Sequence, residues 1–430
     1  MDTSARGNEA LGRLLDTAED APPVQAVEAV TRELGRALGA TSVSFLIADL
    51  SGRSLVRLAH LEPGGGADGA GRQEGEESAT ELPFDGGPAE QALRTQTVQV
   101  VPATAGGEWT VFAPVTERGE ALGLLELTLA GEPGDGDVAN VLRTAHALAF
   151  VLIANRRHTD MFEWGQRTTP FTLPAEIQRR LLPSAFTCEA GAFTLSAWLE
   201  PAAHVGGDTF DYSLGRDALV LSVTDAMGHG VSSALTATLC VGSLRNTRRR
   251  GAGLVEQAAA ANAALFAHTD GLGIEAFATG VLGSLDLASG ALSLLNAGHV
   301  APYLARGDTV SAVALPDGLP LGLFEDARHE QSSLRLEPDD RLVFVTDGMI
   351  ERQAAAVDLV AEIRQTRALH ARETTRYLAD AVLAATGGEL ADDATLLVLD
   401  WHGGHGGRGA DRTTAGGADP ARASSGTAAD

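Results

Sequence analysis

Three aspartates beside β-like apolar runs, joined by a fourth, constrain this chain more than any other feature. Asp225 follows LSVT, Asp347 follows LVFVT, Asp392 shortly precedes TLLVL, and Asp208 joins them in VGGDTFDY. A single aspartate beside a glycine is usually only a turn residue. Several strand-end carboxylates that converge, however, form an oxygen-only cage for hard divalent cations. The set therefore predicts a metal-dependent hydrolase.

Length and charge narrow the class of protein. The chain has 430 residues, of which 44% are hydrophobic, which is enough for two or three domains of ~100 to 200 residues each. Its formal net charge is -25, and all 32 basic residues are arginine. Nucleic acids and anionic membranes are bound mainly through basic side chains, so neither is an expected partner.

The cysteines and the amino terminus favour a soluble, cytoplasmic protein. Cys188 and Cys240 lie in unlike contexts, so they form neither a disulfide framework nor a zinc spacing. The amino terminus is acidic and lacks the basic-then-apolar layout of a signal peptide. The longest apolar stretch, residues 147–154, is far shorter than the ~20 residues of a membrane span.

Periodicity divides the chain into overlapping parts. We expect a flexible N-terminus at 1–23, a first domain at 24–155, a linker helix at 137–173, a second domain at 174–401 and a disordered, Gly- and Ala-rich tail at 402–430. The fold class is α+β. The first domain has a central antiparallel sheet, and the second, in which strands and helices are segregated, has two stacked antiparallel sheets flanked by helices.

In the first domain, the pattern predicts a helix ending near Gly39, a hairpin over residues 41–60, a mobile loop at 62–81, then a helix and two or three strands. The segments LGATSVSFLIADLSG and APVTERGEALGLLEL resemble a GAF domain. That resemblance implies a small-molecule sensor. A sensor-shaped domain used only for dimerisation or packing is the alternative.

The linker helix, expected from about Asp137 to Trp164, carries apolar residues spaced 3, 4, 3, 4, as in a heptad seam: Val138, Val141, Ala145, Leu148 and Leu152. Two interpretations stay open. The seam either forms a parallel coiled coil in a homodimer or packs on the preceding sheet.

The second domain carries seven motifs in order: EIQRRLLP, HVGGDTFDY, TDAMGHG, NAGHVAPYL, GLPLGL, LEPDDRLVFVTDGMIE and DDATLLVL. Together they resemble the SpoIIE-type phosphatases, the bacterial branch of the metal-dependent PPM serine/threonine protein phosphatases. The resemblance implies an α-β-β-α sandwich. It also implies two Mn2+ or Mg2+ ions, because a pair of such ions neutralises phosphoryl oxygens and activates a water.

By this resemblance, Asp225 bridges the two ions and the carbonyl of Ala226 binds one of them. Asp347 and Asp392 complete the other, and Asp208 holds the first directly or through water. The choice of Asp392 over its neighbour follows the family pattern alone. Four further carboxylates are given supporting or surface roles: Asp211, Asp339, Asp340 and Asp393.

Two departures from the family pattern stand out. Ala226 replaces a common glycine, and Met227 stands where the eukaryotic branch has a histidine. His229 and His299 each have two interpretations, as packing residues or as site residues. A small-molecule phosphatase would need basic residues lining the pocket, and the motifs show no arginine cluster beside them.

The resemblance implies hydrolysis of phosphoserine or phosphothreonine by attack of metal-bound hydroxide. The implied substrate is a phosphorylated anti-sigma factor antagonist of the STAS type. The helix EIQRRLLP is expected to couple the sensor, through its ligand or dimer state, to the metal site. The alternative function is a catalytically weak or silent pseudophosphatase that acts as a partner-binding regulatory module.

Overall fold

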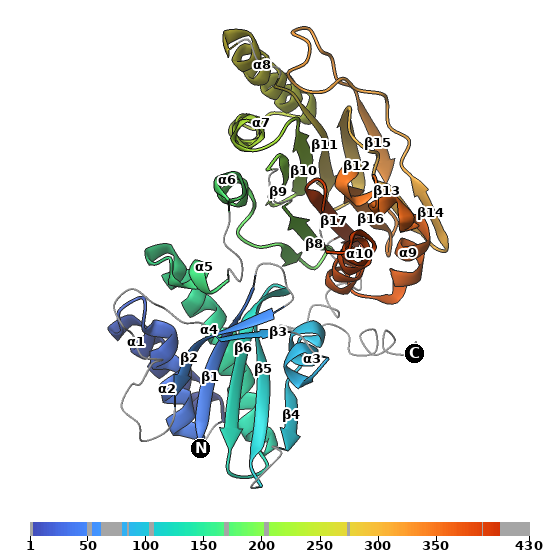
Figure 1. Cartoon of the computed structure of the whole chain (residues 1–430). Helices are drawn as coiled ribbons and strands as arrows, with labels where there is room; N and C mark the ends of the chain where they lie inside the picture. The colour runs from blue at the N-terminus through green and yellow to red at the C-terminus, as the bar shows by residue number, and fades with distance from the viewer. Residues whose placement is uncertain are drawn as a thin grey trace. The chain divides into compact units, whose positions relative to one another are not determined.

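The structure is a computed structural model that describes residues 3–49, 54–61, 80–83, 86–102, 107–166, 172–201, 206–272, 276–388 and 390–404. Most of the predicted mobile loop and nearly all of the predicted tail lie outside these residues. The chain forms two compact units, one up to Pro170 and one from Phe171 (Figure 1).

A six-stranded antiparallel sheet forms the centre of the first unit. In sheet order its strands are β3 (Thr80–Pro83), β2 (Ser54–Leu61), β1 (Ser42–Ala48), β6 (Glu120–Leu129), β5 (Trp109–Glu117) and β4 (Gln99–Pro102). Helices α2 (Ala26–Leu38) and α4 (Asp135–Asn155) share its main core, and α3 (Pro88–Thr95) packs on a separate apolar cluster. The predicted helices, hairpin and antiparallel sheet are confirmed, whereas the likeness to a GAF domain stays a prediction.

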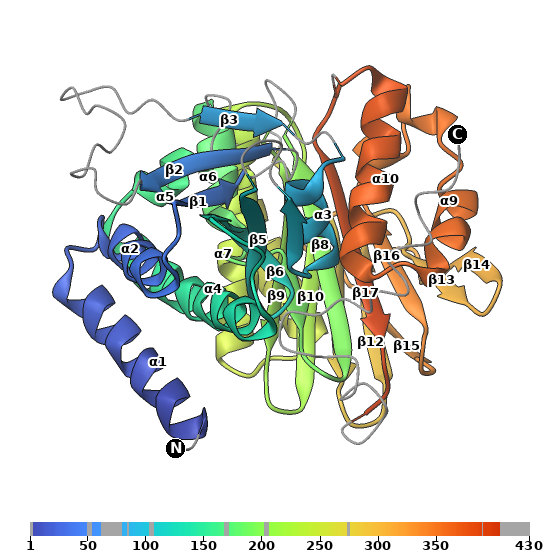
Figure 2. The same ribbon diagram turned by 90° about the horizontal axis from the view of Figure 1, so that it is seen from below.

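The amino terminus differs from its prediction. Residues within 1–23 were expected to be flexible, but α1 (Thr3–Asp20) is a helix that lies beside α2 (Figure 2). Leu14 and Ala18, spaced four apart, pack partly against the core of the first unit. Residues four apart share one face of a helix. This packing therefore stabilises a helix in a segment that was expected to be flexible.

Helix α4 uses its apolar seam inside the first unit. Val141, Ala145, Leu148 and Leu152 are buried in the core beside the sheet, so the packing alternative describes these positions. Dimerisation through this helix stays a prediction. Asp135–His158 is also the one segment among the described residues that is long and apolar enough to cross a membrane, and part of its apolar surface packs on β5.

The predicted continuous linker helix is interrupted. After α4 come a 3-10 turn, Arg156–His158, and a short helix, α5 (Met161–Gly165). Between them Thr159 is extended, with φ -155° and ψ 145°, and its hydroxyl accepts a hydrogen bond from the backbone N–H of Met161 at 3.1 Å. The threonine side chain therefore begins a new helix instead of continuing the old one.

Two antiparallel sheets form the second unit. One has the order β15 (Gln331–Arg335), β12 (Ala291–Ala297), β11 (Ala278–Asp286), β10 (Ala218–Ala226) and β9 (Asp208–Leu214). The other has the order β14 (Thr309–Ala312), β13 (Tyr303–Arg306), β16 (Arg341–Val345), β17 (Ala394–Trp401), β8 (Phe193–Glu200) and β7 (Thr187–Glu189). The prediction of two antiparallel sheets is confirmed.

A core lies between these sheets, where Phe210 and Leu221 of one sheet share an apolar cluster with Leu397 of the other. Helices α7 (Val231–Arg249) and α8 (Leu254–Leu272) cover the β9–β15 sheet, and α9 (Leu359–Gln365) and α10 (Ala371–Thr386) cover the β7–β14 sheet (Figure 1). The result is the expected α-β-β-α sandwich. It is preceded by α6 (Leu173–Leu181), which holds the motif EIQRRL.

Candidate active site

The strand pairing brings the four predicted aspartates to one end of the sandwich. Asp208 begins β9, Asp225 is the penultimate residue of β10, and the two are paired in register. In the other sheet, Asp347 follows β16, and Asp392 precedes its antiparallel neighbour β17. The end of one antiparallel strand lies beside the start of its neighbour, so each sheet contributes two carboxylates at a single edge.

Asp208 links the two sheets. Its side chain is buried, and one carboxylate oxygen, Oδ2, accepts hydrogen bonds from the hydroxyls of Thr346 at 2.6 Å and Thr395 at 2.7 Å. The Thr346 hydroxyl also accepts from the backbone N–H of Thr395 at 3.0 Å. Because Thr395 lies in β17 and Thr346 directly follows β16, these bonds connect the Asp208 side of the site to the sheet that carries Asp347 and Asp392.

Two glycines allow the site loops to approach closely. A Cβ at Gly207 would lie 2.3 Å from the carbonyl oxygen of Ala226, and a Cβ at Gly348 would lie 2.0 Å from the carbonyl oxygen of Asp393. Ala226 itself is not among the residues with positive φ. Its methyl group, in place of the family's glycine, therefore costs no left-handed strain.

Mutual repulsion shows that the carboxylates share one neighbourhood. Burial, and then the charges of Asp347, Asp392 and Asp393, raise the pKa of Asp225 to about 7. Burial and the nearby Asp225 likewise raise the pKa of Asp208 well above its usual range, and burial with Asp392 raises that of Asp347. Carboxylates that repel one another in this way are suited to a cation, and an all-oxygen donor set fits Mn2+ or Mg2+.

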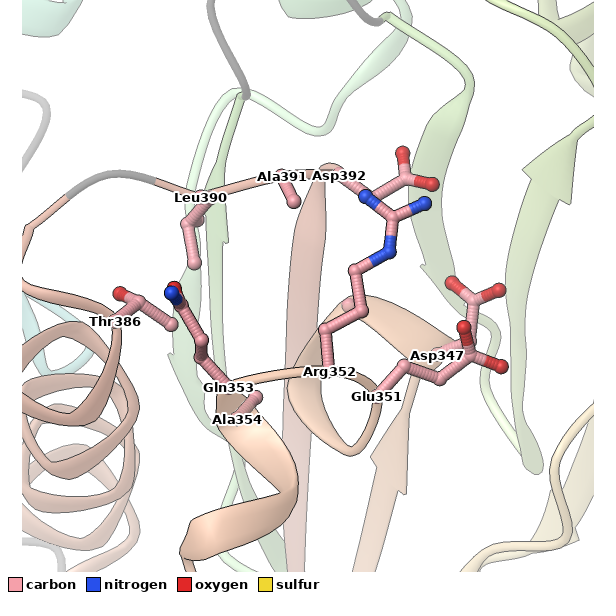
Figure 3. Close-up of a pocket in the computed structure, with 10 residues that line it drawn as sticks. Asp347, Glu351, Arg352, Gln353, Ala354, Thr386, Leu390, Ala391 and Asp392 are labelled. Carbon is pink, nitrogen blue, oxygen red and sulfur yellow. The ribbon is translucent and has the colours of Figure 1, made fainter.

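The side chains do not form a closed cage. Within the described ranges, no group of three or more Asp, Glu, His or Cys side chains lies close enough to hold a metal ion. Asp347 and Asp392 line a pocket that is open to solvent (Figure 3), whereas Asp208 and Asp225 do not line it. The donors therefore fit the metal in kind and lie at one edge without enclosing it.

Asp393 and Gln178 support the site, and the role of Gln178 was not predicted. Oδ2 of Asp393 accepts hydrogen bonds from Gln178 Nε2 at 2.7 Å and from the backbone N–H groups of Gly207 at 3.0 Å and Asp208 at 3.4 Å. Gln178 also donates to the carbonyl oxygen of Asp208 at 2.8 Å. One buried glutamine of α6 therefore holds together the loops that carry Asp208 and Asp392. The sequence offered one signal for this role: Gln178 is a polar residue three positions after Ala175, so both lie on the same face of the helix.

The other residues named in the sequence analysis form ion pairs or are exposed. Asp211 pairs with Arg245 and Arg248 of α7 at 2.8 Å each, and Asp340 pairs with Arg306. Asp339 is exposed, as are Met227 and His229. Asp211, Asp339 and Asp340 therefore do not belong to the group of four site aspartates.

His299 fixes a loop. Its Nδ1 lies 2.7 Å from the hydroxyl of Thr279, and its backbone N–H and carbonyl both bond to the side chain of Asn296, at 2.8 and 3.1 Å. Burial lowers the pKa of His299 to about 4. Its ring is therefore neutral at physiological pH.

His299 is expected to make folding stability depend on pH. The folded protein keeps the ring neutral down to pH about 4, while the unfolded chain binds a proton below about 6.5. The stability that the neutral ring contributes to folding is therefore complete above the unfolded pKa. It is lost as the pH falls toward the folded pKa, by about 3 kcal/mol at most. Denaturant unfolding of the wild type and His299→Gln between pH 7 and 4 should show a shallower loss in the variant; equal slopes would contradict this.

Comparison with known proteins identifies relatives of the second unit. Residues 215–402 match the family model described as Stage II sporulation protein E (SpoIIE). These residues therefore form a SpoIIE-type phosphatase domain of the PPM class.

Particular relatives share this part of the chain. The chain is 23% identical over 233 residues to phosphoserine phosphatase RsbU of Bacillus subtilis (strain 168), covering 53% of this chain and 68% of RsbU. It is 24% identical over 200 residues to the stage II sporulation protein E of the same organism, covering 45% of this chain but 24% of that protein. Among solved structures, the RsbU and RsbW domains of Rv1364c from Mycobacterium tuberculosis are 28% identical, with a TM-score of 0.42, covering 50% of this chain and 61% of that one.

Proposed function

We propose that this chain removes phosphate from phosphoserine or phosphothreonine in a regulatory protein. The observation that carries the proposal is the placement of two carboxylates from each sheet at one edge of the sandwich. Asp208, Asp225, Asp347 and Asp392, with the carbonyl of Ala226, would hold two Mn2+ or Mg2+ ions. Such ions neutralise phosphoryl oxygens and make a water acidic enough to supply hydroxide near neutral pH.

The chain's own residues would orient this machinery. The hydroxyls of Thr346 and Thr395 occupy one oxygen of Asp208, so that carboxylate keeps one orientation. Asp393 accepts from two backbone N–H groups in the Asp208 loop and so positions that loop. Residues that hold metal ligands in place in this way commonly contribute 10- to 100-fold to metal affinity or activity.

The substrate we propose is a phosphorylated anti-sigma factor antagonist of the STAS type, in the cytoplasm. The likeness to RsbU, a phosphoserine phosphatase by its name, supports a phosphoserine substrate, and the family resemblance of the motifs implies the antagonist protein that carries it. We also propose that the first unit is a GAF-like sensor whose small-molecule ligand or homodimeric state regulates the phosphatase. Its antiparallel sheet, with α2 and α4 in one core, is consistent with that role.

Hydrolysis of p-nitrophenyl phosphate by the full chain tests the activity. Turnover should require Mn2+ or Mg2+, stop with a chelator, and be absent in Asp347→Ala. A partner-binding pseudophosphatase is the second candidate, and the absence of a closed cage among the described side chains favours it. The pseudophosphatase would be favoured if the wild type showed no turnover above the metal-free background and yet bound the phosphorylated antagonist stably.

Helix α6 is the proposed regulatory connection, because Gln178 bonds both site loops. Gln178→Leu would leave the Asp208 carbonyl and Asp393 Oδ2 without this donor. We expect the Mn2+ concentration for half-maximal activity to rise roughly 10- to 100-fold. Arg180→Gln, at an exposed position of the same helix, is the matched control and should leave it unchanged. An unaltered Mn2+ requirement in Gln178→Leu would remove α6 from the regulation.

A further inference from the structure

The pocket lined by Asp347 and Asp392 also contains one positively charged side chain, which cannot be a metal ligand. Its lining is Asp347, Gly348, Glu351, Arg352, Gln353, Ala354, Thr386, Leu390, Ala391 and Asp392. The acids would repel a phosphate dianion, whereas Arg352 is the one cationic side chain in this lining. Figure 3 shows the Arg352 side chain extending from its loop toward Asp392.

Arg352 also has a strained backbone. Its φ is +53°, in the left-handed region that glycine adopts readily and that side chains seldom adopt. The side chain is exposed, and no hydrogen bond or ion pair joins it to another described residue. No side-chain hydrogen bond or ion pair with a described residue therefore accounts for this conformation, and such outliers cluster at ligand-binding sites.

We propose that Arg352 binds the phosphoryl oxygens of the substrate, an assignment that rests on the proposed phosphatase function. A guanidinium presents paired N–H donors that match two phosphate oxygens, and it stays charged at every working pH. The left-handed backbone directs it along the pocket to the side of the metal-site carboxylates. Arg352 thus sets the position of the phosphate ester beside Asp347 and Asp392. The sequence motifs did not predict this role, because Arg352 is a single arginine directly after TDGMIE and not part of a cluster.

Titration with inorganic phosphate in magnesium buffer tests this assignment directly. Arg352→Gln should weaken phosphate binding and raise KM for p-nitrophenyl phosphate roughly 10- to 100-fold, the usual scale for a charge-assisted bidentate contact. Arg352→Lys keeps the charge but lacks the paired N–H donors, so its phosphate affinity and KM should lie between those of the wild type and Arg352→Gln. Arg249→Gln, an exposed arginine at the end of α7, is the control and should match the wild type.

A glycine substitution separates binding from structure. Arg352→Gly relieves the left-handed strain, so its denaturant midpoint should rise while phosphate binding falls as in Arg352→Gln. Wild-type phosphate affinity in Arg352→Gln, or a wild type that binds no phosphate, would overturn the assignment. If the wild type shows no metal-dependent turnover, the proposed function fails. Phosphate titration of the wild type and of Arg352→Gln still decides whether Arg352 binds phosphate.

Discussion

Asp225→Asn should lower metal-dependent turnover by roughly a thousandfold, or about 4 kcal/mol of transition-state stabilisation. The amide has the shape of the carboxylate but not its charge, and Asp225 is the proposed bridge between two ions. Without metal, the same change should stabilise the fold, because burial and Asp347, Asp392 and Asp393 all disfavour a charge at Asp225. Steady-state hydrolysis of p-nitrophenyl phosphate in Mn2+ and denaturant unfolding in a chelator measure the two effects.

The matched control for this change is Asp217→Asn, at an exposed position just before the same strand. It should alter neither activity nor stability. Activity in Asp225→Asn within about tenfold of wild type, a cost of only about 1.4 kcal/mol, would contradict a bridging role.

Gly348→Ala should lower activity by roughly a hundredfold, the cost that a displacement of about 1 Å can carry in an active site. The new Cβ would lie 2.0 Å from the carbonyl oxygen of Asp393 and 3.2 Å from Cα of Ala394. Both atoms belong to the backbone, so the turn that carries Asp347 must move away from the start of β17. A further loss of about 1 to 3 kcal/mol in unfolding free energy is expected from overpacking.

Gly242→Ala is the matched control for Gly348→Ala. Gly242 lies within α7, where an added Cβ meets open space, so alanine should stabilise the protein by about 0.5 to 1 kcal/mol without changing activity. Wild-type kinetics in Gly348→Ala would show that the close approach of the two loops has no part in catalysis.

The sequence predicted the central elements of the sandwich better than its edges. Strand β10, which contains Asp225, and strand β16, which precedes Asp347, are apolar because both of their faces are largely buried, and such runs are recognisable. The edge strands β14 (TVSA) and β15 (QSSLR) have little apolar pattern, since an edge strand is half exposed and gains its order from its neighbour. Neither was predicted as a strand.

The supporting residues of the site depend on tertiary geometry that one sequence does not display. Gln178 matters because it reaches Asp208 and Asp393 across the fold, and Arg352 because a left-handed backbone places it in the pocket. The strand-end contexts of Asp225, Asp347 and Asp392 suggested that these aspartates would lie near one another, whereas Asp208 was added from its own motif. Their roles as metal ligands remain a prediction.

Calorimetric titration of Mn2+ into the chelator-treated full chain tests the central claim most directly. If the four aspartates hold a pair of ions, the wild type should bind two Mn2+ per chain, and Asp225→Asn should lose or greatly weaken both. No saturable binding by the wild type, or the same stoichiometry and affinity in Asp225→Asn, would contradict the metal site and the phosphatase proposal built on it.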